Sequence, residues 1–135
     1  MNSEKNRERF RDLTLLSASE RNYPNSPDAA RLEAFENVYA DRDYVIEFDC
    51  PEYTSLCPVT GQPDFGHIIV RYVPDKKCIE SKSLKLYLYS FRNTNTFHEE
   101  SVNTILDAVV KTCSPRPAEV IARFRPRGGI GINVK

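Results

Sequence analysis

The sequence is poor in the residues that build metal sites, membrane spans and secreted scaffolds. It has only two histidines, His67 and His98, and its four cysteines form no C-x-x-C pair. Zinc-ligand spacing is therefore absent, and we expect no metal. No window approaches the roughly 20 apolar residues of a membrane span, and the N-terminus lacks the apolar core of a secretory signal. We expect a cytoplasmic protein with reduced thiols rather than disulfides.

Charge of one sign is also lacking. The 19 lysines and arginines balance the 19 aspartates and glutamates, so bulk charge predicts neither a nucleic-acid nor a membrane partner. The chain has 135 residues, 40% hydrophobic and 28% charged, which suits one globular domain. We assign residues 1–30 to a flexible N-terminal arm, because they are polar, contain Pro24 and Pro27 and show no sustained periodicity. Residues 31–135 form the single domain.

Regular patterns begin at Tyr44 and predict four strands and two helices. The strands, recognised by their period of two, span 44–49, 65–74, 119–125 and 129–135, and the helices span 80–93 and 98–113. We expect a long loop at 50–64, where proline and glycine are frequent, and a short helix or an extended segment at 32–39. The order ββααββ indicates an α+β domain, with an antiparallel four-stranded sheet and both helices on one face.

The sheet face turned away from the helices is predicted to be charged. It would carry Glu47, Asp49, Arg71, Arg123, Arg125 and Lys135. Many antiparallel sheets expose such a face to solvent. Alternatively, the open strand edges could join copies of the chain into a closed ring that encloses a watery tunnel. The pattern alone does not choose between these arrangements.

The stretch TSLCPVTGQPDFG combines a cysteine with an aspartate seven positions later. Cys57 lies in the predicted loop, where functional residues concentrate, and a nucleophilic thiol needs a neighbouring base or a positive environment. Asp64 could carry a proton if the loop folded back to bring the two side chains together. The structural alternative is a small buried cysteine and a turn-forming aspartate.

The stretch TFHEE has two interpretations. Thr96 and Glu99 fit the capping box T-x-x-E at the start of the second helix, which leaves His98 without a role. Alternatively, the Glu99 carboxylate could accept hydrogen bonds from the N–H edge of a guanine-like base.

The stretch ESKSLK opens the first helix with two lysines on one face, Lys82 and Lys85. The helix dipole favours anions at this end, so a negative group is expected nearby. A phosphate-bearing ligand would satisfy this demand, with Arg127 joining the two lysines. A solvated basic face is the alternative.

Taken together, LCPVTGQPDFG, ESKSLK, FRNTNTFHEE and RPRGGIGIN, in this order, resemble the short form of the NADPH-dependent nitrile reductases of queuosine biosynthesis, which act on 7-cyano-7-deazaguanine. The resemblance runs from about Leu32 to the end of the chain, and E-S-K-S-L-K matches the family's signature hexapeptide. It implies the tunnelling fold (T-fold), in which subunits join their sheets into a barrel with active sites at subunit interfaces. We expect a homo-oligomer, a decamer of two stacked pentamers.

The resemblance also implies roles for residues. Cys57 would attack the nitrile carbon to form a covalent thioimide, and Asp64 would supply the proton to the nitrogen. Two NADPH molecules would complete the four-electron reduction to the aminomethyl product. The implied substrate-binding residues are Ile79, Glu80, Ser81, His98 and Glu99, and the implied cofactor-binding residues are Lys82, Lys85 and Arg127. Ser101 stands where some relatives carry a second cysteine, so redox protection of Cys57 through that partner is not implied.

Two other functions remain open. A GTP cyclohydrolase-like pterin or purine enzyme of the same fold would need zinc, and the scarcity of histidine argues against it. A non-catalytic oligomeric RNA-binding module would use the lysines and arginines. In the reductase family the product enters tRNA through other enzymes, so the resemblance implies no direct contact with nucleic acid.

Overall fold

The computed structural model describes residues 3–14 and 23–135. The helices and strands of these residues are α1 (Ser3–Phe10), β1 (Ala34–Glu36), β2 (Ile46–Leu56), β3 (Pro63–Tyr72), β4 (Lys77–Ile79), α2 (Ser81–Tyr89), α3 (His98–Cys113), β5 (Ala118–Arg127) and β6 (Ile130–Val134). The main sheet is antiparallel with the order β2-β3-β5-β6, and β1 pairs with β4 in a separate two-stranded sheet. The predicted α+β class and the ββααββ order of the main elements are confirmed.

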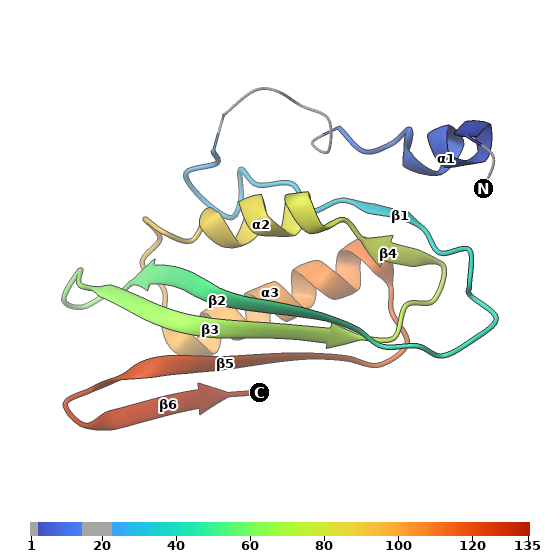
Figure 1. The fold of residues 1–135 in the computed structure, drawn as a ribbon. Helices are drawn as coiled ribbons and strands as arrows, with labels where there is room; N and C mark the ends of the chain where they lie inside the picture. Colours follow the sequence, from blue (N-terminus) through green and yellow to red (C-terminus); the bar gives the residue numbers. More distant parts are fainter. Residues whose placement is uncertain (1–2, 15–22) are drawn as a thin grey trace.

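The core lies between the main sheet and the two helices α2 and α3, which cover one face of the sheet (Figure 1). Alternation along the strands sends every second side chain into this layer. Ile68 and Val70 of β3 and Ala122 of β5 are at most 1% exposed, and Ile105 and Val109 of α3 are fully buried against them. The predicted apolar sides of the strands and helices therefore form one continuous core.

The long loop expected at 50–64 is mostly strand. β2 continues to Leu56 and β3 already begins at Pro63, so the connection shrinks to residues 57–62. The extent of β2 was underestimated because the register of its pairing with β3 shifts between Cys50 and Tyr53. Such a bulge interrupts the period of two on which the recognition of a strand depends. Pro51 is tolerated because β2 is an edge strand of the sheet.

The segment 32–39 is extended rather than helical, since Ala34–Glu36 pairs with Lys77–Ile79. The three-residue strand β4 was not predicted, because it is too short to show a period. Glu33, just before β1, is 5% exposed, and its backbone carbonyl accepts a hydrogen bond from the Glu80 N–H. This small sheet ties the N-terminal side of the domain to the start of α2.

The predicted N-terminal arm contains a helix, α1, that the sequence analysis missed. The Phe10 ring packs edge-on against Phe35 of β1, with 5.4 Å between ring centroids. The Thr14 N–H donates hydrogen bonds of 3.0 and 3.2 Å to the two carboxylate oxygens of the buried Glu33. These contacts attach the described part of the arm to β1. Residues 1–2 and 15–22 of the predicted arm lie outside the described residues.

The outer face of the sheet is charged, as predicted. Five of the six residues expected there are exposed, and the sixth, Arg71, is half-buried. Arg71 pairs with Glu47 of β2 at 2.7 Å and with Glu119 of β5 at 3.2 Å. Across the described ranges, none of the helices has the length and apolarity needed to cross a bilayer.

Candidate functional site

Cys57 and Asp64 lie at the two sides of a tight turn between β2 and β3. The Cys57 N–H donates to the Gln62 carbonyl at 2.9 Å, and the Gly61 N–H donates to the Cys57 carbonyl at 2.9 Å. Gly61 has φ of 69°, a left-handed conformation that glycine adopts without strain. Because Ser55 of β2 pairs with Asp64 of β3, the turn folds back as the sequence analysis required for these two side chains to meet.

The pKa of the Cys57 thiol is lowered from its ordinary value of 9.0 to about 7. The largest cause is a hydrogen bond from the Thr60 hydroxyl, followed by the backbone N–H groups of Thr60 and Val59, with a smaller contribution from Arg127. All of these donors stabilise the thiolate. Cys57 is half-buried, so a reacting molecule can reach its sulfur. A thiol with this pKa is about half ionised at neutral pH, which suits a nucleophile.

The environments of Cys50 and Cys113 raise the thiol pKa instead of lowering it. Burial raises the pKa of Cys50 to about 11, with a further contribution from Asp49, and burial also raises the pKa of Cys113 to about 11. Cys78 is buried, and all four cysteines are free. The turn therefore distinguishes Cys57 chemically from Cys50 and Cys113.

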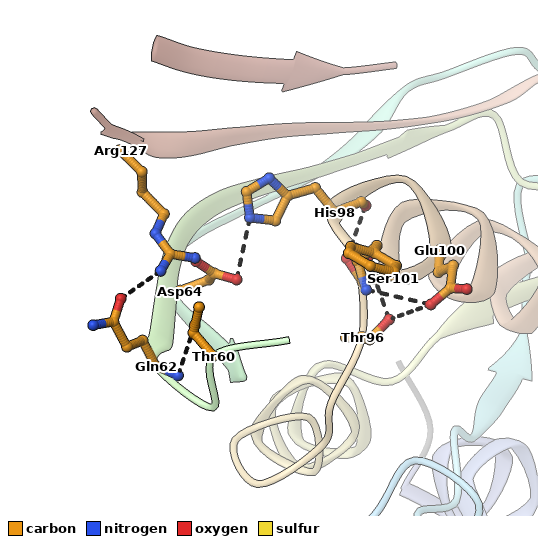
Figure 2. A network of polar contacts seen from close by, with 9 residues as sticks. Thr60, Gln62, Asp64, Thr96, His98, Glu100, Ser101 and Arg127 are labelled. Atoms are coloured by element: carbon orange, nitrogen blue, oxygen red, sulfur yellow. Dashed lines mark hydrogen bonds and ion pairs between the residues drawn. The ribbon is translucent and has the colours of Figure 1, made fainter. Parts of the chain in front are cut away.

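Asp64 is a buried carboxylate held by two partners, as Figure 2 shows. Arg127, near the end of β5, donates from Nη1 to Asp64 Oδ1 at 2.8 Å and from Nη2 to Gln62 Oε1 at 2.6 Å. The His98 Nε2 lies 3.3 Å from Asp64 Oδ2. The Asp64 side chain is only 4% exposed, so both contacts act where solvent screening is weak. Arg127 thus links Asp64 to the turn that carries Cys57.

His98 is the first residue of α3, and its ring contacts both Phe124 and Asp64. It lies parallel to the Phe124 ring of β5, with 3.7 Å between centroids and 4° between planes. The Ser101 hydroxyl donates to the His98 carbonyl at 3.0 Å. The start of α3 is itself tied to the turn, because the Thr96 N–H donates to the Leu56 carbonyl at 3.0 Å. These contacts place His98 beside Asp64.

The predicted capping box of Thr96 with Glu99 is wrong by one residue. The helix begins at His98, and Glu100 accepts hydrogen bonds from the Phe97 N–H at 3.3 Å and from the Thr96 hydroxyl at 3.4 Å. The T-x-x-E spacing matched Glu99 because two glutamates follow each other. Since Glu100 makes the cap, the exposed Glu99 carboxylate is not needed for it.

The negative group expected at the start of α2 is Glu80 itself. Its carboxylate accepts hydrogen bonds of 2.7 Å from the Lys82 and Ser83 N–H groups, and the residue is 3% exposed. Glu80 therefore compensates the helix dipole, so the structure does not require an external anion there. Lys85 is exposed and Lys82 half-buried.

Seven of the ten predicted site residues fall into two groups. Cys57, Asp64, His98 and Arg127 are brought together at the β2–β3 turn. Ile79, Glu80 and Ser81 precede or open α2, which starts beside β4 and away from that turn (Figure 1). Within one chain the two groups do not meet. Thr60, Gln62 and Phe124 were missed, because only the folded turn and the strand pairing reveal their contacts.

No group of three or more metal-binding side chains occurs among the residues that the structure describes. Asp64 is instead surrounded by hydrogen-bond donors from Arg127 and His98. The arrangement can ionise a thiol and hold a carboxyl group at the same turn.

Comparisons with known proteins agree on one family. The family model described as QueF-like protein matches residues 63–135. A protein of Streptococcus mutans, named NADPH-dependent 7-cyano-7-deazaguanine reductase, is 56% identical over 126 residues, covering 93% of this chain and 78% of that protein. A Neisseria gonorrhoeae protein of the same name is 48% identical over 129 residues, covering 96% and 82%.

Among solved structures, the apo archaeosine synthase QueF-Like matches with a TM-score of 0.60 at 21% sequence identity. The match covers 68% of this chain and 88% of that one. At this identity the likeness concerns the fold alone.

Proposed function

The chain belongs to the family of NADPH-dependent 7-cyano-7-deazaguanine reductases, and from this membership we propose that it reduces the nitrile of 7-cyano-7-deazaguanine to the aminomethyl group. It is an oxidoreductase of the queuosine pathway, which supplies a modified nucleoside of tRNA. The observation that carries the proposal is an ionisable thiol, Cys57, at the same β2–β3 turn as the buried carboxyl group of Asp64, in a chain 56% identical to a named reductase.

In the proposed reaction, the Cys57 thiolate adds to the nitrile carbon. One π bond of the nitrile breaks, a carbon–sulfur bond forms, and the nitrogen takes up one proton to give a thioimide. The thiol loses one proton in becoming a thiolate, so the two protons balance. Asp64 is the carrier between sulfur and nitrogen, supported by its position across the turn from Cys57. His98 and Arg127 hold the Asp64 carboxyl group in place during this transfer.

NADPH, when bound, supplies the hydride, and two molecules are needed for the four electrons. Lys82 and Lys85 on the first turns of α2 suit its phosphate groups, because they place two cations together and Lys85 is exposed. Arg127 was also expected to bind the cofactor. Its hydrogen bonds to Asp64 and Gln62 support a role at the catalytic carboxyl group instead.

The deazaguanine base is proposed to bind beside α3. Glu99 is exposed and free of the helix cap, so its carboxylate is available for the N–H edge of the base, with His98 adjacent. Of the residues 79–81, Ile79 and Glu80 are buried and Ser81 is exposed. The Ser81 hydroxyl is therefore the side chain of this group best placed to touch a substrate.

A complete site is proposed to need two subunits. The start of α2 cannot contribute to the turn of its own chain, so Ser81, Lys82 and Lys85 would come from a neighbour. The open edges β2 and β6 and the charged outer face support a T-fold barrel, and the decamer of two pentamers stays our expectation. A cytoplasmic location fits the proposal, because a reducing compartment keeps the Cys57 thiol free.

The test is nitrile-dependent NADPH oxidation together with mass spectrometry of the protein mixed with 7-cyano-7-deazaguanine. We expect NADPH consumption only with the nitrile, and a covalent mass increase on the wild-type protein. Cys57→Ala should abolish both, whereas Cys50→Ala serves as the matched control and should retain them. A Cys57→Ala variant that still oxidised NADPH with the nitrile would contradict the covalent mechanism.

A further inference from the structure

A cavity is lined by residues of β2, β3 and β5, including side chains of the outer face of the sheet. It has a volume of about 360 Å³, within the range typical of small-molecule pockets. Its lining includes Pro51 and Glu52 at the β2 bulge, Phe65 of β3, and Arg123 and Arg125 of β5. Arg92, which follows α2, also lines it. None of these residues belongs to the site proposed for nitrile reduction.

The arginines reach this cavity because of the strand alternation in β5. Phe124 points into the core, so its neighbours Arg123 and Arg125 point to the outer face. Arg123 pairs across the sheet with His67, and the Arg125 guanidinium lies 5.3 Å from the centroid of the Phe65 ring. Three guanidinium groups and an aromatic ring that is 44% exposed therefore line one hollow.

The charge of the cavity is unbalanced. Several other arginines of the fold pair with carboxylates, as in Arg71 with Glu47 and Arg116 with Asp43. Among the described residues, Arg92, Arg123 and Arg125 form no ion pair. Arg92 lies over the Tyr89 ring at 4.4 Å, which leaves the edge of its guanidinium available. Glu52 is the single carboxylate in the lining.

We propose that this cavity binds a phosphate-bearing anion with at least two phosphate groups. Guanidinium groups bind phosphate oxygens in pairs, and several of them together match a diphosphate better than a single phosphate. The same diphosphate chemistry occurs in free pyrophosphate and in a nucleoside diphosphate. For a nucleotide, the exposed Phe65 ring offers a surface on which the base can stack.

The experiment is isothermal titration calorimetry of the full chain with inorganic pyrophosphate. The test variant is Arg123→Gln with Arg125→Gln. The matched control is Arg42→Gln with Lys111→Gln, which removes the same charge from exposed residues outside the cavity lining. We expect saturable binding to the wild-type protein and to the control, and a dissociation constant raised by about tenfold or more in the test variant.

If pyrophosphate binding were weakened equally in the test and control variants, the proposal would be overturned, because the loss of net charge alone would then explain the weaker binding. Absence of binding to the wild-type protein at millimolar pyrophosphate would overturn it as well. Circular dichroism checks that each variant is folded. If the double variant is unfolded, the single variants Arg123→Gln and Arg125→Gln are titrated in its place. Neither readout uses the nitrile, so the outcome is independent of the proposed reductase activity.

A second arm distinguishes the two sources of the diphosphate. If the cavity is a nucleotide site, adenosine diphosphate should bind more tightly than pyrophosphate. The Phe65→Leu variant should then bind the two ligands with equal affinity. Equal affinities in the wild-type protein would identify the free inorganic anion as the ligand class.

Discussion

Replacing Thr60 with valine should move the pH at which Cys57 becomes reactive. The Thr60 hydroxyl is the largest single cause of the lowered thiol pKa, and valine keeps the shape of the side chain without the donor. With a pKa of about 7, roughly half of the thiol is ionised at pH 7, whereas a thiol at its ordinary 9.0 is about 1% ionised. The backbone donors and Arg127 remain in the variant. We therefore expect the pKa to rise by part of this interval, by about one unit.

The direction of the pH dependence follows from the thiolate being the reactive form. For the wild-type protein, the rate of thiol modification should rise as the pH increases through about 7 and level off above it. For Thr60→Val the rise should come about one unit higher, so that the rate at pH 7 falls several-fold. Above pH 9 the variant should match or exceed the wild type, since a thiolate of higher pKa is the stronger nucleophile.

The assay is the rate of alkylation of Cys57 by iodoacetamide between pH 5 and 10, followed by mass spectrometry of the peptide that contains it. A second series measures the rate of adduct formation with 7-cyano-7-deazaguanine. Thr60→Ser keeps a hydroxyl at the same position and is the matched control, with a profile close to the wild type. A Thr60→Val profile that coincides with the wild type would show that the hydroxyl does not stabilise the thiolate.

Three further predictions concern the site and the core. Asp64→Asn should still capture the nitrile as a covalent adduct but reduce it slowly, and stopped-flow absorbance separates the two phases; wild-type rates would remove Asp64 from the mechanism. Glu80→Ala removes the cap of α2 and should lower the free energy of unfolding by about 1 kcal/mol in urea, whereas an unchanged value would contradict the capping role. Ile105→Ala, at a fully buried position of α3, should cost about 2–5 kcal/mol in the same titration, and a loss below 1 kcal/mol would mean that the core collapses around the gap.

Much of the fold followed from local patterns. Helix α3 was predicted with its observed bounds, because its apolar stripe is regular and Pro115 stops it. The strand β2 was underestimated because its bulge breaks the alternation, and no single-sequence rule foresees where a partner strand shifts register. Helix α1 has one large apolar residue, Phe10, whose partner Phe35 is distant in sequence. Its stability comes from a tertiary contact that a local pattern does not contain.

For the candidate site, the sequence identified single residues, but not the contacts between distant ones. Cys57 and Asp64 stood out by residue type and by a motif shared with a known family, and the strand pairing places both residues at one turn. The contact of Arg127 with Asp64 spans 63 residues and depends on the pairing of β3 with β5. Glu80 was expected to bind the substrate, and only the folded geometry shows that its carboxylate caps α2.

The attachment of Thr14 to Glu33 has a practical consequence for handling the protein. A chain shortened to begin at residue 23 would leave the buried Glu33 carboxylate without the Thr14 N–H, while Arg31 would remain 3.9 Å from it. The same glutamate's main chain touches Glu80 and Ser83, so the disturbance would reach the α2 lysines. Truncations that remove Thr14 are therefore expected to disturb the start of α2 as well as β1.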